Sequence, residues 1–380
     1  MKLLKNPPNH VVCGRQIAFA AAFLLPMGKL LEAPSLLAKY AKGDLLAPAF
    51  LHFFLQAAAL ALLLFALRKS KYSLAERLQA AIGKWAAPIY LLFAAYYLFA
   101  AVLPLLDLEK FTYAAFSDTE PTLFVFASFF FLAAFICTKS LKSIARCADL
   151  CLFLFLIPFC ALLAMGAFKA DFSHLLPLFG TPLEGTMSAF THTIPHFSDL
   201  TMLLPLLFFY QPRKGDEKKI LLGYGVGALC TLAFLAVFFG LYASIAPREH
   251  YAFSKIAQYF PALSVIGRLD LFFVYLISIV LLFFTCLPLQ YATELVCATF
   301  SLSSRHYVAT AINIAAFFFT LFCNKYYDSI YALFCKQFPI IFVLFAYLPP
   351  IFACFLPKDA AKSSIIPRAK NTCRKEDNHA

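Results

Sequence analysis

Two stretches decide the fold of this chain: Leu25-Pro26-Met27-Gly28-Lys29 and Thr193-Ile194-Pro195-His196-Phe197-Ser198-Asp199. Each lies inside a long apolar segment and combines a proline with an ionisable residue. A proline within a helix removes a backbone hydrogen bond and clashes with the preceding turn, so both stretches are predicted helix breaks. Charge at membrane depth is costly and usually faces a cavity or a partner, so the breaks are also the candidate site.

The two stretches belong to a series of ten apolar windows. Seven contain no Asp, Glu, Lys or Arg: residues 45–67, 85–106, 121–138, 220–246, 271–293, 307–324 and 337–357. Three are interrupted, namely 16–38 by Lys29 and Glu32, 147–168 by Asp149, and 185–210 by Asp199. About 20 apolar residues cross a bilayer as a helix, so the chain is predicted to be an all-α polytopic membrane protein with ten transmembrane helices.

Composition agrees with a membrane protein. Of the 380 residues, 62% are hydrophobic and 14% are charged, against roughly 45–50% and 25% in a soluble domain. The 12 Cys form no CxxC pair, so they predict no disulfide framework. P-loop, GxSxG and HExxH motifs are absent from the sequence, which disfavours an enzyme. His192 and His196 lie one turn apart with Asp199 beyond, but Pro195 disturbs that face, so we predict neither a metal site nor a cofactor.

The formal net charge of +12 reflects topology rather than a nucleic-acid surface. If the N-terminus is cytoplasmic, the connections on that side and the tail hold 22 of the 32 Lys and Arg, and the outer connections hold nine. Lys29 is the remaining one. Because cytoplasmic connections are enriched in Lys and Arg, both termini are predicted cytoplasmic, and no nucleic-acid partner is expected.

The breaks occupy corresponding positions, in the first helix of each of two five-helix sets. Paired interrupted helices of this kind indicate an inverted-repeat transporter fold with a ligand site at the membrane midplane. We predict one transmembrane domain over residues 1–357, with repeats at about 13–168 and 185–357, and a cytoplasmic polar tail at 358–380. Amphipathic segments at 73–83 and 249–260 are predicted as short interfacial helices.

Short motifs along nearly the whole chain carry a family resemblance. They are Gly14-Arg15-Gln16, Lys42-Gly43-Asp44, Gly83-Lys84-Trp85, Ser143-Ile144-Ala145-Arg146, Leu175-Leu176-Pro177, Phe253-Ser254-Lys255 and Gly267-Arg268-Leu269-Asp270. In order and spacing the chain resembles the B subunit of spore-germination (germinant) receptors, within the amino acid–polyamine–organocation transporter superfamily. One departure is Pro26-Met27-Gly28-Lys29, which stands where the superfamily has a glycine-rich break.

The resemblance implies a leucine-transporter-type fold with broken helices 1 and 6, and a role in sensing a small germinant, typically an amino acid. It also implies partners, namely a membrane A subunit and a C-subunit lipoprotein, in the inner membrane of the endospore. The alternative function is a proton- or cation-coupled amino acid permease in the cell membrane. A structural assembly partner without a ligand is a third class. Fold alone does not separate these functions.

The predicted ligand site lies at the two breaks. Amide groups freed at a half-helix N-terminus attract a carboxylate, and unwound carbonyl groups suit an ammonium. The predicted set is Pro26, Met27, Gly28, Lys29, Tyr97, His196, Phe197, Ser198 and Asp199. His52 and Gln56 share a helix face, where interhelical hydrogen bonds are favoured over a ligand role.

Lys29 has two predicted partners. Asp199 lies across the cavity if the breaks face each other, and Glu32 lies one turn along the same segment. The ammonium could stand in for the cation that ion-coupled relatives bind. The alternative is a structural ion pair that holds the two repeats together.

The topology predicts that residues 68–84 face the cytoplasm. A single cysteine engineered there, on a cysteine-free background, should resist a membrane-impermeant maleimide in intact cells and react after permeabilisation. Efficient labelling from outside would overturn the topology.

Overall fold

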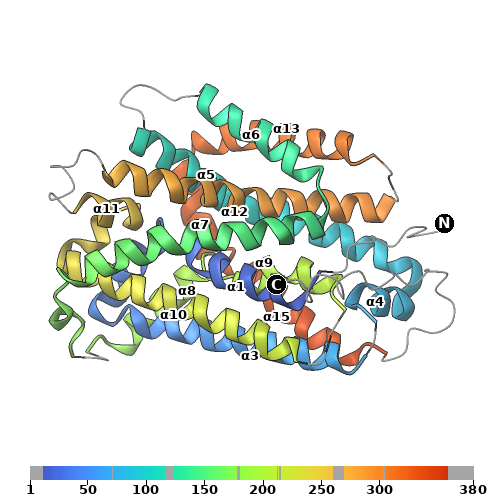
Figure 1. Cartoon of the computed structure of the whole chain (residues 1–380), viewed down its shortest axis with the longest axis horizontal. Coiled ribbons are helices and arrows are strands. Elements are labelled where there is room, and N and C mark those ends of the chain that lie inside the picture. The colour runs from blue at the N-terminus through green and yellow to red at the C-terminus, as the bar shows by residue number, and fades with distance from the viewer. Residues whose placement is uncertain are drawn as a thin grey trace.

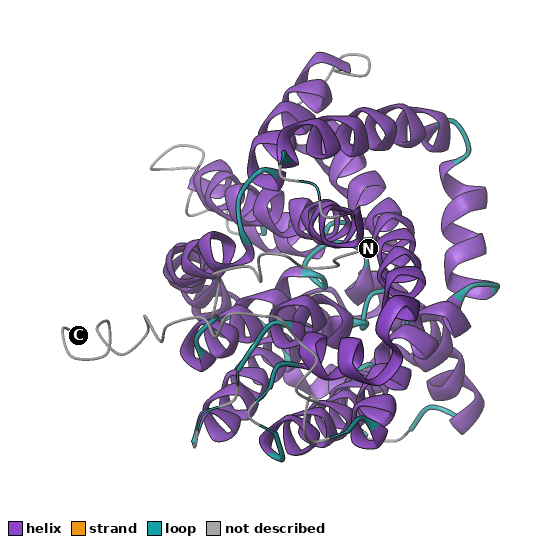
Figure 2. Cartoon of the chain, turned by 90° about the vertical axis from the view of Figure 1, so that its right-hand side faces the viewer, coloured by secondary structure: helices purple, strands orange, loops and turns teal. Residues whose placement is uncertain are grey.

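The computed structural model describes residues 12–357 except 71, 117–122, 178–179, 212, 214, 260–268, 301 and 303. Over these residues the chain is helical and contains no strand (Figure 2). The α-helices are α1 (Gly14–Met27), α2 (Ala33–Ala41), α3 (Leu46–Arg68), α4 (Leu74–Ile82), α5 (Ala86–Phe116), α6 (Leu123–Cys137), α7 (Leu141–Ala167), α8 (Leu183–Thr193), α9 (Asp199–Phe208), α10 (Asp216–Tyr242), α11 (Ala252–Gln258), α12 (Leu269–Phe300), α13 (Arg305–Asn324), α14 (Tyr327–Lys336) and α15 (Pro339–Phe355). Short 3-10 helices are η1 (Lys42–Asp44), η2 (Gly83–Trp85), η3 (Phe172–Leu175) and η4 (Ala243–Arg248).

Each of the ten predicted windows contains helix, but the helices differ in length. Within the described ranges, α3, α5, α7, α10, α12 and α13 are each long and apolar enough to cross a membrane alone. The bent pair α14 and α15 makes a seventh candidate. The other windows hold the shorter apolar helices α1, α6 and α9. The all-α membrane fold is thus confirmed, and the count of ten spans stays a prediction.

Both predicted helix breaks are present. The first apolar segment stops being helical at Met27 and resumes at Ala33, and the sixth stops at Thr193 and resumes at Asp199. Pro26 lies at the end of α1, and Pro34 lies in the first turn of α2, where a helix does not need the missing N–H group. Pro195 lies inside the second break itself. The prolines therefore fix where the helices end.

A third interruption was not predicted. Residues 337–357 read as one clean span, but the helical segment begins earlier, at Tyr327, and α14 and α15 meet at an angle of 47°. Pro339 is the first residue of α15, and a proline disfavours helical geometry at the residue before it. The bend follows from this local constraint, which the charge-free composition of the window does not reveal.

Helix α1 lies inside the bundle, between α7 and α10 in Figure 1. Twelve of its 14 residues are buried, which its many alanines allow. Gly223 and Gly227 of α10 bring the two backbones together, because a Cβ at Gly223 would collide with the carbonyl group of Ala18. Small residues that permit close backbone approach are the usual means of helix association in lipid. This close contact fixes the first half-helix of the site.

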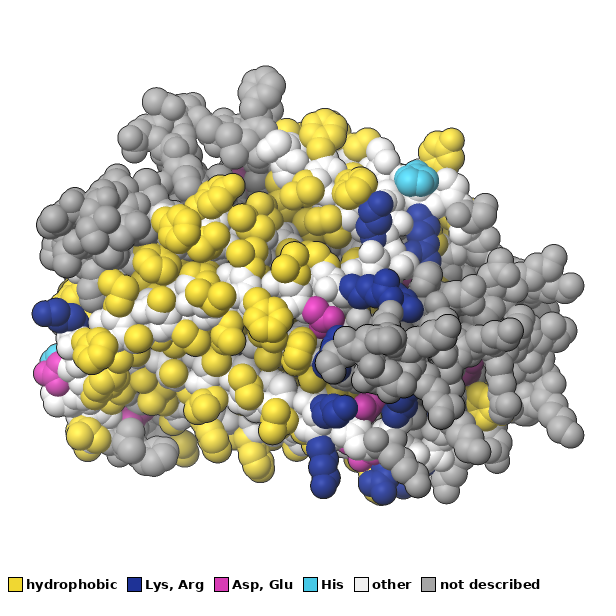
Figure 3. Space-filling model, in the orientation of Figure 1, with side chains coloured by type: hydrophobic (Ala, Val, Ile, Leu, Met, Phe, Trp, Pro, Cys, Tyr) yellow, Lys and Arg dark blue, Asp and Glu magenta, His cyan; other side chains and the backbone are white. Residues whose placement is uncertain are grey.

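The outer surface carries an apolar belt. Large side chains on α6, α7 and α13 are exposed, including Phe131, Ile157 and Phe318. Figure 3 shows hydrophobic side chains across the middle of one face, with Lys and Arg gathered toward the end where α4 lies. An apolar belt of this kind is what contact with hydrocarbon requires.

The helix predicted at 73–83 is present as α4, and its position at the membrane interface stays a prediction. Ser73 and Glu76 form a capping box at its start. Its Arg77 is only 2% exposed and donates hydrogen bonds of 2.9–3.1 Å to the carbonyl oxygens of Ala66, Ala353, Leu356 and Pro357. Carbonyl groups at a helix C-terminus lack intrahelical partners, so this one guanidinium completes the end of α15 and ties it to α3.

The close contact between α1 and α10 predicts a sharp difference between two glycines. Gly223→Ala should destabilise the protein by about 1–3 kcal/mol, because the added methyl group meets the Ala18 backbone. Gly225→Ala is the matched control, since a Cβ there meets no atom within 4 Å. Thermal unfolding in detergent, followed by size-exclusion chromatography, measures both. Equal stability of the two variants would contradict the proposed packing constraint.

Candidate functional site

The two breaks are joined by an ion pair. Nζ of Lys29 donates a hydrogen bond to Oδ1 of Asp199. The side chains are 0% and 6% exposed, so each charge is compensated mainly by the other. A lone charge at this depth would be strongly destabilising, whereas a hydrogen-bonded pair is tolerated. Of the two partners open to Lys29 in the sequence, the structure thus selects Asp199.

Glu32 has a different partner. Its Oε2 lies 2.7 Å from Nδ1 of His250, in the segment between η4 and α11. That same segment closes over the first break through its backbone. The amides of Ala252 and Phe253 donate to the carbonyl oxygens of Leu31 and Leu30, at 3.2 and 3.0 Å. The carbonyl oxygens of Leu30 and Leu31, inside the first break, are therefore paired with α11 and are not open to a ligand.

Aromatic rings enclose the Lys29 ammonium. Nζ lies 5.0 Å from the ring centroid of Phe197 and 5.8 Å from that of Phe53. Cations are attracted to the faces of such rings, most strongly where water is excluded. The His52 ring stacks on Phe197 with a centroid distance of 4.6 Å. Lys29 is thus held by one carboxylate and two rings.

Helix α3 supports both sides of the second break. Nε2 of His52 lies 3.1 Å from the carbonyl oxygen of Phe190 and 3.1 Å from Oγ1 of Thr193, at the end of α8. One turn along α3, Oε1 of Gln56 accepts a hydrogen bond of 3.0 Å from the amide of Leu200, at the start of α9. The predicted interhelical role of His52 and Gln56 is confirmed, and it places the two half-helices relative to each other.

A small cavity lies between the breaks. Its volume of about 50 Å³ has room for roughly three to five water molecules. Five residues of the predicted set line it: Met27, Gly28, His196, Ser198 and Asp199. Pro26, Lys29, Tyr97 and Phe197 are not in the lining. Lys29 reaches Asp199 from outside the lining and lies over the Phe197 ring. Tyr97 donates its hydroxyl hydrogen to the carbonyl oxygen of Thr201 at 2.8 Å.

Some lining residues were missed by sequence reasoning. Asp107 of α5, Met202 of α9 and Thr285 of α12 also face the cavity. Asp107 was assigned to the outer connection, but α5 continues through it to Phe116. The apolar neighbours of Asp107 on both sides were the available signal, since they extend the helical pattern past the acid. Tyr327 donates to Oδ1 of Asp107 at 3.2 Å.

The cavity has an acidic character. Asp107 and Asp199 both line it, and Lys29 pairs with Asp199. The other oxygen of Asp199, Oδ2, has no hydrogen-bond partner among the described residues. His196 is held at the edge by Tyr331 of α14, with a distance of 3.0 Å between Nε2 and the hydroxyl. This arrangement suits a small ligand that carries a positive group.

Comparison with known proteins places the chain in a family. A family model described as spore germination protein (spore permease) matches residues 49–328. This chain belongs to the spore germination protein family. A search of curated proteins found no significant match.

The structural neighbours are transporters. MhsT in complex with L-phenylalanine has a TM-score of 0.62 and 13% identity, over 91% of this chain and 92% of that one. A Na⁺-coupled sialic acid symporter in a substrate-bound outward-open state has a TM-score of 0.53 and 14% identity, over 87% and 79%. A mutant of the manganese transporter of Eremococcus coleocola has a TM-score of 0.51 and 12% identity, over 89% and 77%. The leucine-transporter-type fold with broken helices is thereby confirmed, whereas the repeat boundaries stay a prediction.

The contact between His250 and Glu32 predicts a pH dependence. The hydrogen bond to Glu32 raises the pKa of His250, with Glu249 acting in the same direction and Lys255 against it. A raised folded-state pKa stabilises the fold below the unfolded value of about 6.5, and the stabilisation is lost as pH rises through the folded value.

The thermal midpoint of the wild type should therefore fall as pH is raised through neutrality, by more than in His250→Asn. Because the His250 side chain is 61% exposed, the difference should be small. Differential scanning fluorimetry in nanodiscs from about pH 5.5 to 8.5 measures it. Parallel curves for the two proteins would contradict the role of the pair.

Proposed function

We propose that this protein binds a small nutrient germinant, an amino acid, in the cavity between the two breaks, and that binding triggers spore germination. One observation carries the proposal. A small cavity lined by residues of both breaks presents two carboxyl groups, Asp107 and Asp199, and Lys29 pairs with only one of them. Family membership supplies the biological process, and the L-phenylalanine in MhsT makes amino acids the ligand class to test first.

The ligand ammonium would bind near Asp107 and the unpaired Oδ2 of Asp199. Ser198 and Thr285 also line the cavity, and their hydroxyl oxygens can accept a hydrogen bond while each donates to a backbone carbonyl oxygen. Gly28 leaves the space into which the ligand body fits. Because the volume is only about 50 Å³, a small side chain is favoured unless the walls move.

Ligand binding would act on the ion pair. A second cation beside Asp199 competes with Lys29 for the same carboxylate, so the ligand would change the free energy of the contact between α1 and α9. A ligand shifts a conformational equilibrium only by its unequal affinity for the two states, and this competition supplies such a difference. We propose that the pair stabilises the resting state.

Partner subunits would detect whether this protein is in the resting state. We propose that the protein works with an A-type membrane subunit and a C-type lipoprotein in the inner membrane of the endospore, with both termini in the cytoplasm. This part of the proposal rests on the resemblance of the sequence to receptor B subunits. Co-purification of the three subunits from spores tests it.

The second candidate is an ion-coupled amino acid permease. It is favoured by the transporter fold of the neighbours, one of which is Na⁺-coupled. Uptake of labelled amino acids into proteoliposomes that contain this chain alone separates the two functions. Binding without uptake supports the receptor, and concentrative uptake supports the permease.

Gly28→Ala tests the cavity itself. A Cβ at this position would lie 3.4 Å from Cζ of Phe284 and 3.7 Å from the carbonyl oxygen of His196, both ordinary contacts. The variant should therefore fold normally but fill part of the cavity, and should weaken amino acid binding at least about tenfold. Scintillation-proximity binding in nanodiscs and germination of spores that carry the variant measure the two effects.

Gly225→Ala, in open space on α10, again serves as control. If Gly28→Ala binds amino acids and germinates like the control, the ligand site lies elsewhere. Loss of germination with unchanged binding would separate signalling from recognition and would also contradict the proposal for this cavity.

A further inference from the structure

One exposed face of α7 is basic where the helix starts and apolar beyond. We call this set the α7 stripe: Lys139, Lys142, Arg146, Leu150, Phe153 and Ile157. The residues follow one another at intervals of three or four, which in a helix place side chains on one face. The three apolar side chains are 57–71% exposed and belong to the apolar belt. Figure 3 shows Lys and Arg side chains gathered where this belt ends.

Lys139 marks the depth of the basic part. This residue lies just before α7, and its Nζ is 4.1 Å from the ring centroid of Phe135, which is 60% exposed on α6. A lysine whose stem follows an apolar ring keeps its ammonium at the boundary between hydrocarbon and polar surroundings. Phospholipid headgroups lie at the same level.

The basic part of the stripe carries a net positive charge. Between Lys139 and Ile157 the sequence contains three basic residues and one acidic residue, Asp149. The first turn of α7 contains no acidic residue, although the helix dipole favours one there. A negatively charged partner from outside the chain would therefore be attracted to this part of α7.

Helix α10 provides the contrast. It begins at the same end of the bundle, where Asp216 lies against Gly14 at the start of α1. Its first four residues are two acids followed by two lysines, so their charges cancel. A general excess of basic residues at this end of the protein does not explain why α7 lacks the same balance.

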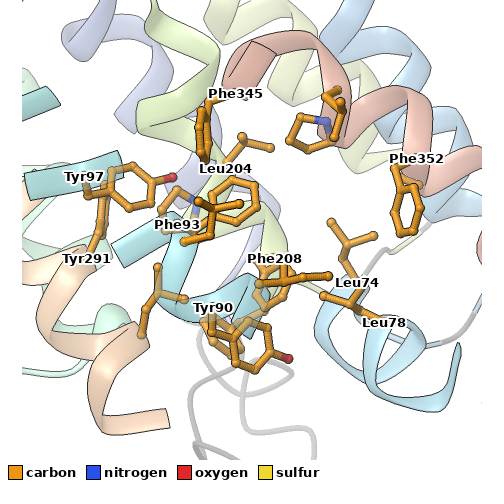
Figure 4. Close-up of a pocket in the computed structure, with 18 of the residues that line it drawn as sticks. Leu74, Leu78, Tyr90, Phe93, Tyr97, Leu204, Phe208, Tyr291, Phe345 and Phe352 are labelled. Carbon is orange, nitrogen blue, oxygen red and sulfur yellow. The ribbon is translucent and has the colours of Figure 1, made fainter. Parts of the chain in front are cut away.

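A larger cavity, shown in Figure 4, lacks such a charge pattern. It has a volume of about 340 Å³, lies between α4, α5, α9, α12 and α15, and is lined mainly by leucine, phenylalanine and tyrosine side chains. Glu294, the one charged residue of its described lining, accepts a hydrogen bond of 2.9 Å from Arg305. That lining does not distinguish one lipid headgroup from another, whereas the α7 stripe does.

We propose that the α7 stripe binds an anionic phospholipid. The headgroup phosphate would lie among Lys139, Lys142 and Arg146, and one acyl chain would follow the apolar part of the stripe. A helix rises about 1.5 Å per residue, so Arg146 and Ile157 are about 16 Å apart along the axis. This is about half of the roughly 30 Å hydrocarbon core, which is the depth that one acyl chain covers. A free phosphate ion would gain only the first of the two contacts.

The lipid would also contact the start of α1. Oδ2 of Asp149 lies 3.7 Å from Nη2 of Arg15, whose side chain is half exposed. Asp149 is one turn beyond Arg146, so a phosphate bound by the stripe would compete with Asp149 for Arg15. The site thus adjoins the helix that leads to the first break, but its occupancy does not depend on the proposed germinant function.

The test compares two photoreactive lipids in nanodiscs that contain the full chain. Phosphatidylglycerol and phosphatidylcholine each carry a diazirine midway along one acyl chain, in a phosphatidylcholine bilayer, and mass spectrometry identifies the labelled residues. Phosphatidylglycerol should label residues 150–157 at least about fivefold more, the effect of one basic residue beside an anionic lipid. Added salt should reduce the difference, because it screens the charges. Equal labelling would overturn the proposal and leave the basic residues to an acidic segment of a partner protein.

Two lysine variants test the role of charge. Lys139→Gln and Lys142→Gln, combined, should remove most of the preference for phosphatidylglycerol at residues 150–157. Lys139→Arg and Lys142→Arg, combined, keep both charges and should keep the preference. The thermal midpoint of each variant in phosphatidylcholine nanodiscs checks that the fold is intact. A preference that survives in the glutamine variant would contradict the site.

Lys218→Gln and Lys219→Gln, combined, are the matched control, because they remove the same charge from the same end of the bundle. This control should leave the labelling of residues 150–157 unchanged. An equal loss of preference in the control and in the glutamine variant of α7 would show a general attraction of the basic end for anionic lipid, and would overturn a site on α7.

Discussion

The contact between Lys29 and Asp199 is the constraint on which the rest of the structure depends. Two charges buried in the middle of a membrane protein are stable only as a pair, so the two broken segments must lie face to face. The residues around the pair are arranged to suit it. Phe53 and Phe197 face the ammonium, and Asp199 starts a helix, whose N-terminal dipole favours a carboxylate. A change that moved either break would expose an uncompensated charge.

A broken helix also releases backbone groups, which hydrocarbon cannot satisfy. The protein supplies partners for several of these groups. His52 and Gln56, one turn apart on α3, serve the end of α8 and the start of α9. The amides at the start of α11 serve the first break. The elements around the breaks therefore pair backbone groups, and the small cavity is the space that remains between them.

The sequence predicts the breaks well because proline and charge act locally. It also predicts that His52 and Gln56 act together, since helical spacing alone puts them on one face. Prediction from the sequence fails where a side chain's partner depends on how other helices pack. Whether Lys29 faces Asp199 or Glu32 is decided by how α9 and α11 pack, and Tyr97 points to Thr201 rather than into the cavity for the same reason. Asp107 was missed because we assumed that a charged residue ends a membrane span, whereas α5 continues through it.

Arg77 gives the fold a mechanical property. Its guanidinium is a rigid planar fork, and its hydrogen bonds reach both α3, in the first predicted repeat, and the end of α15, in the second. If the tilt between α3 and α15 changes, the guanidinium cannot keep its hydrogen bonds to both helices. Helix α4 must then move with one of them, or Arg77 must lose hydrogen bonds to the other. The short helix would thus convert a tilt inside the bilayer into displacement of a lever at the membrane surface.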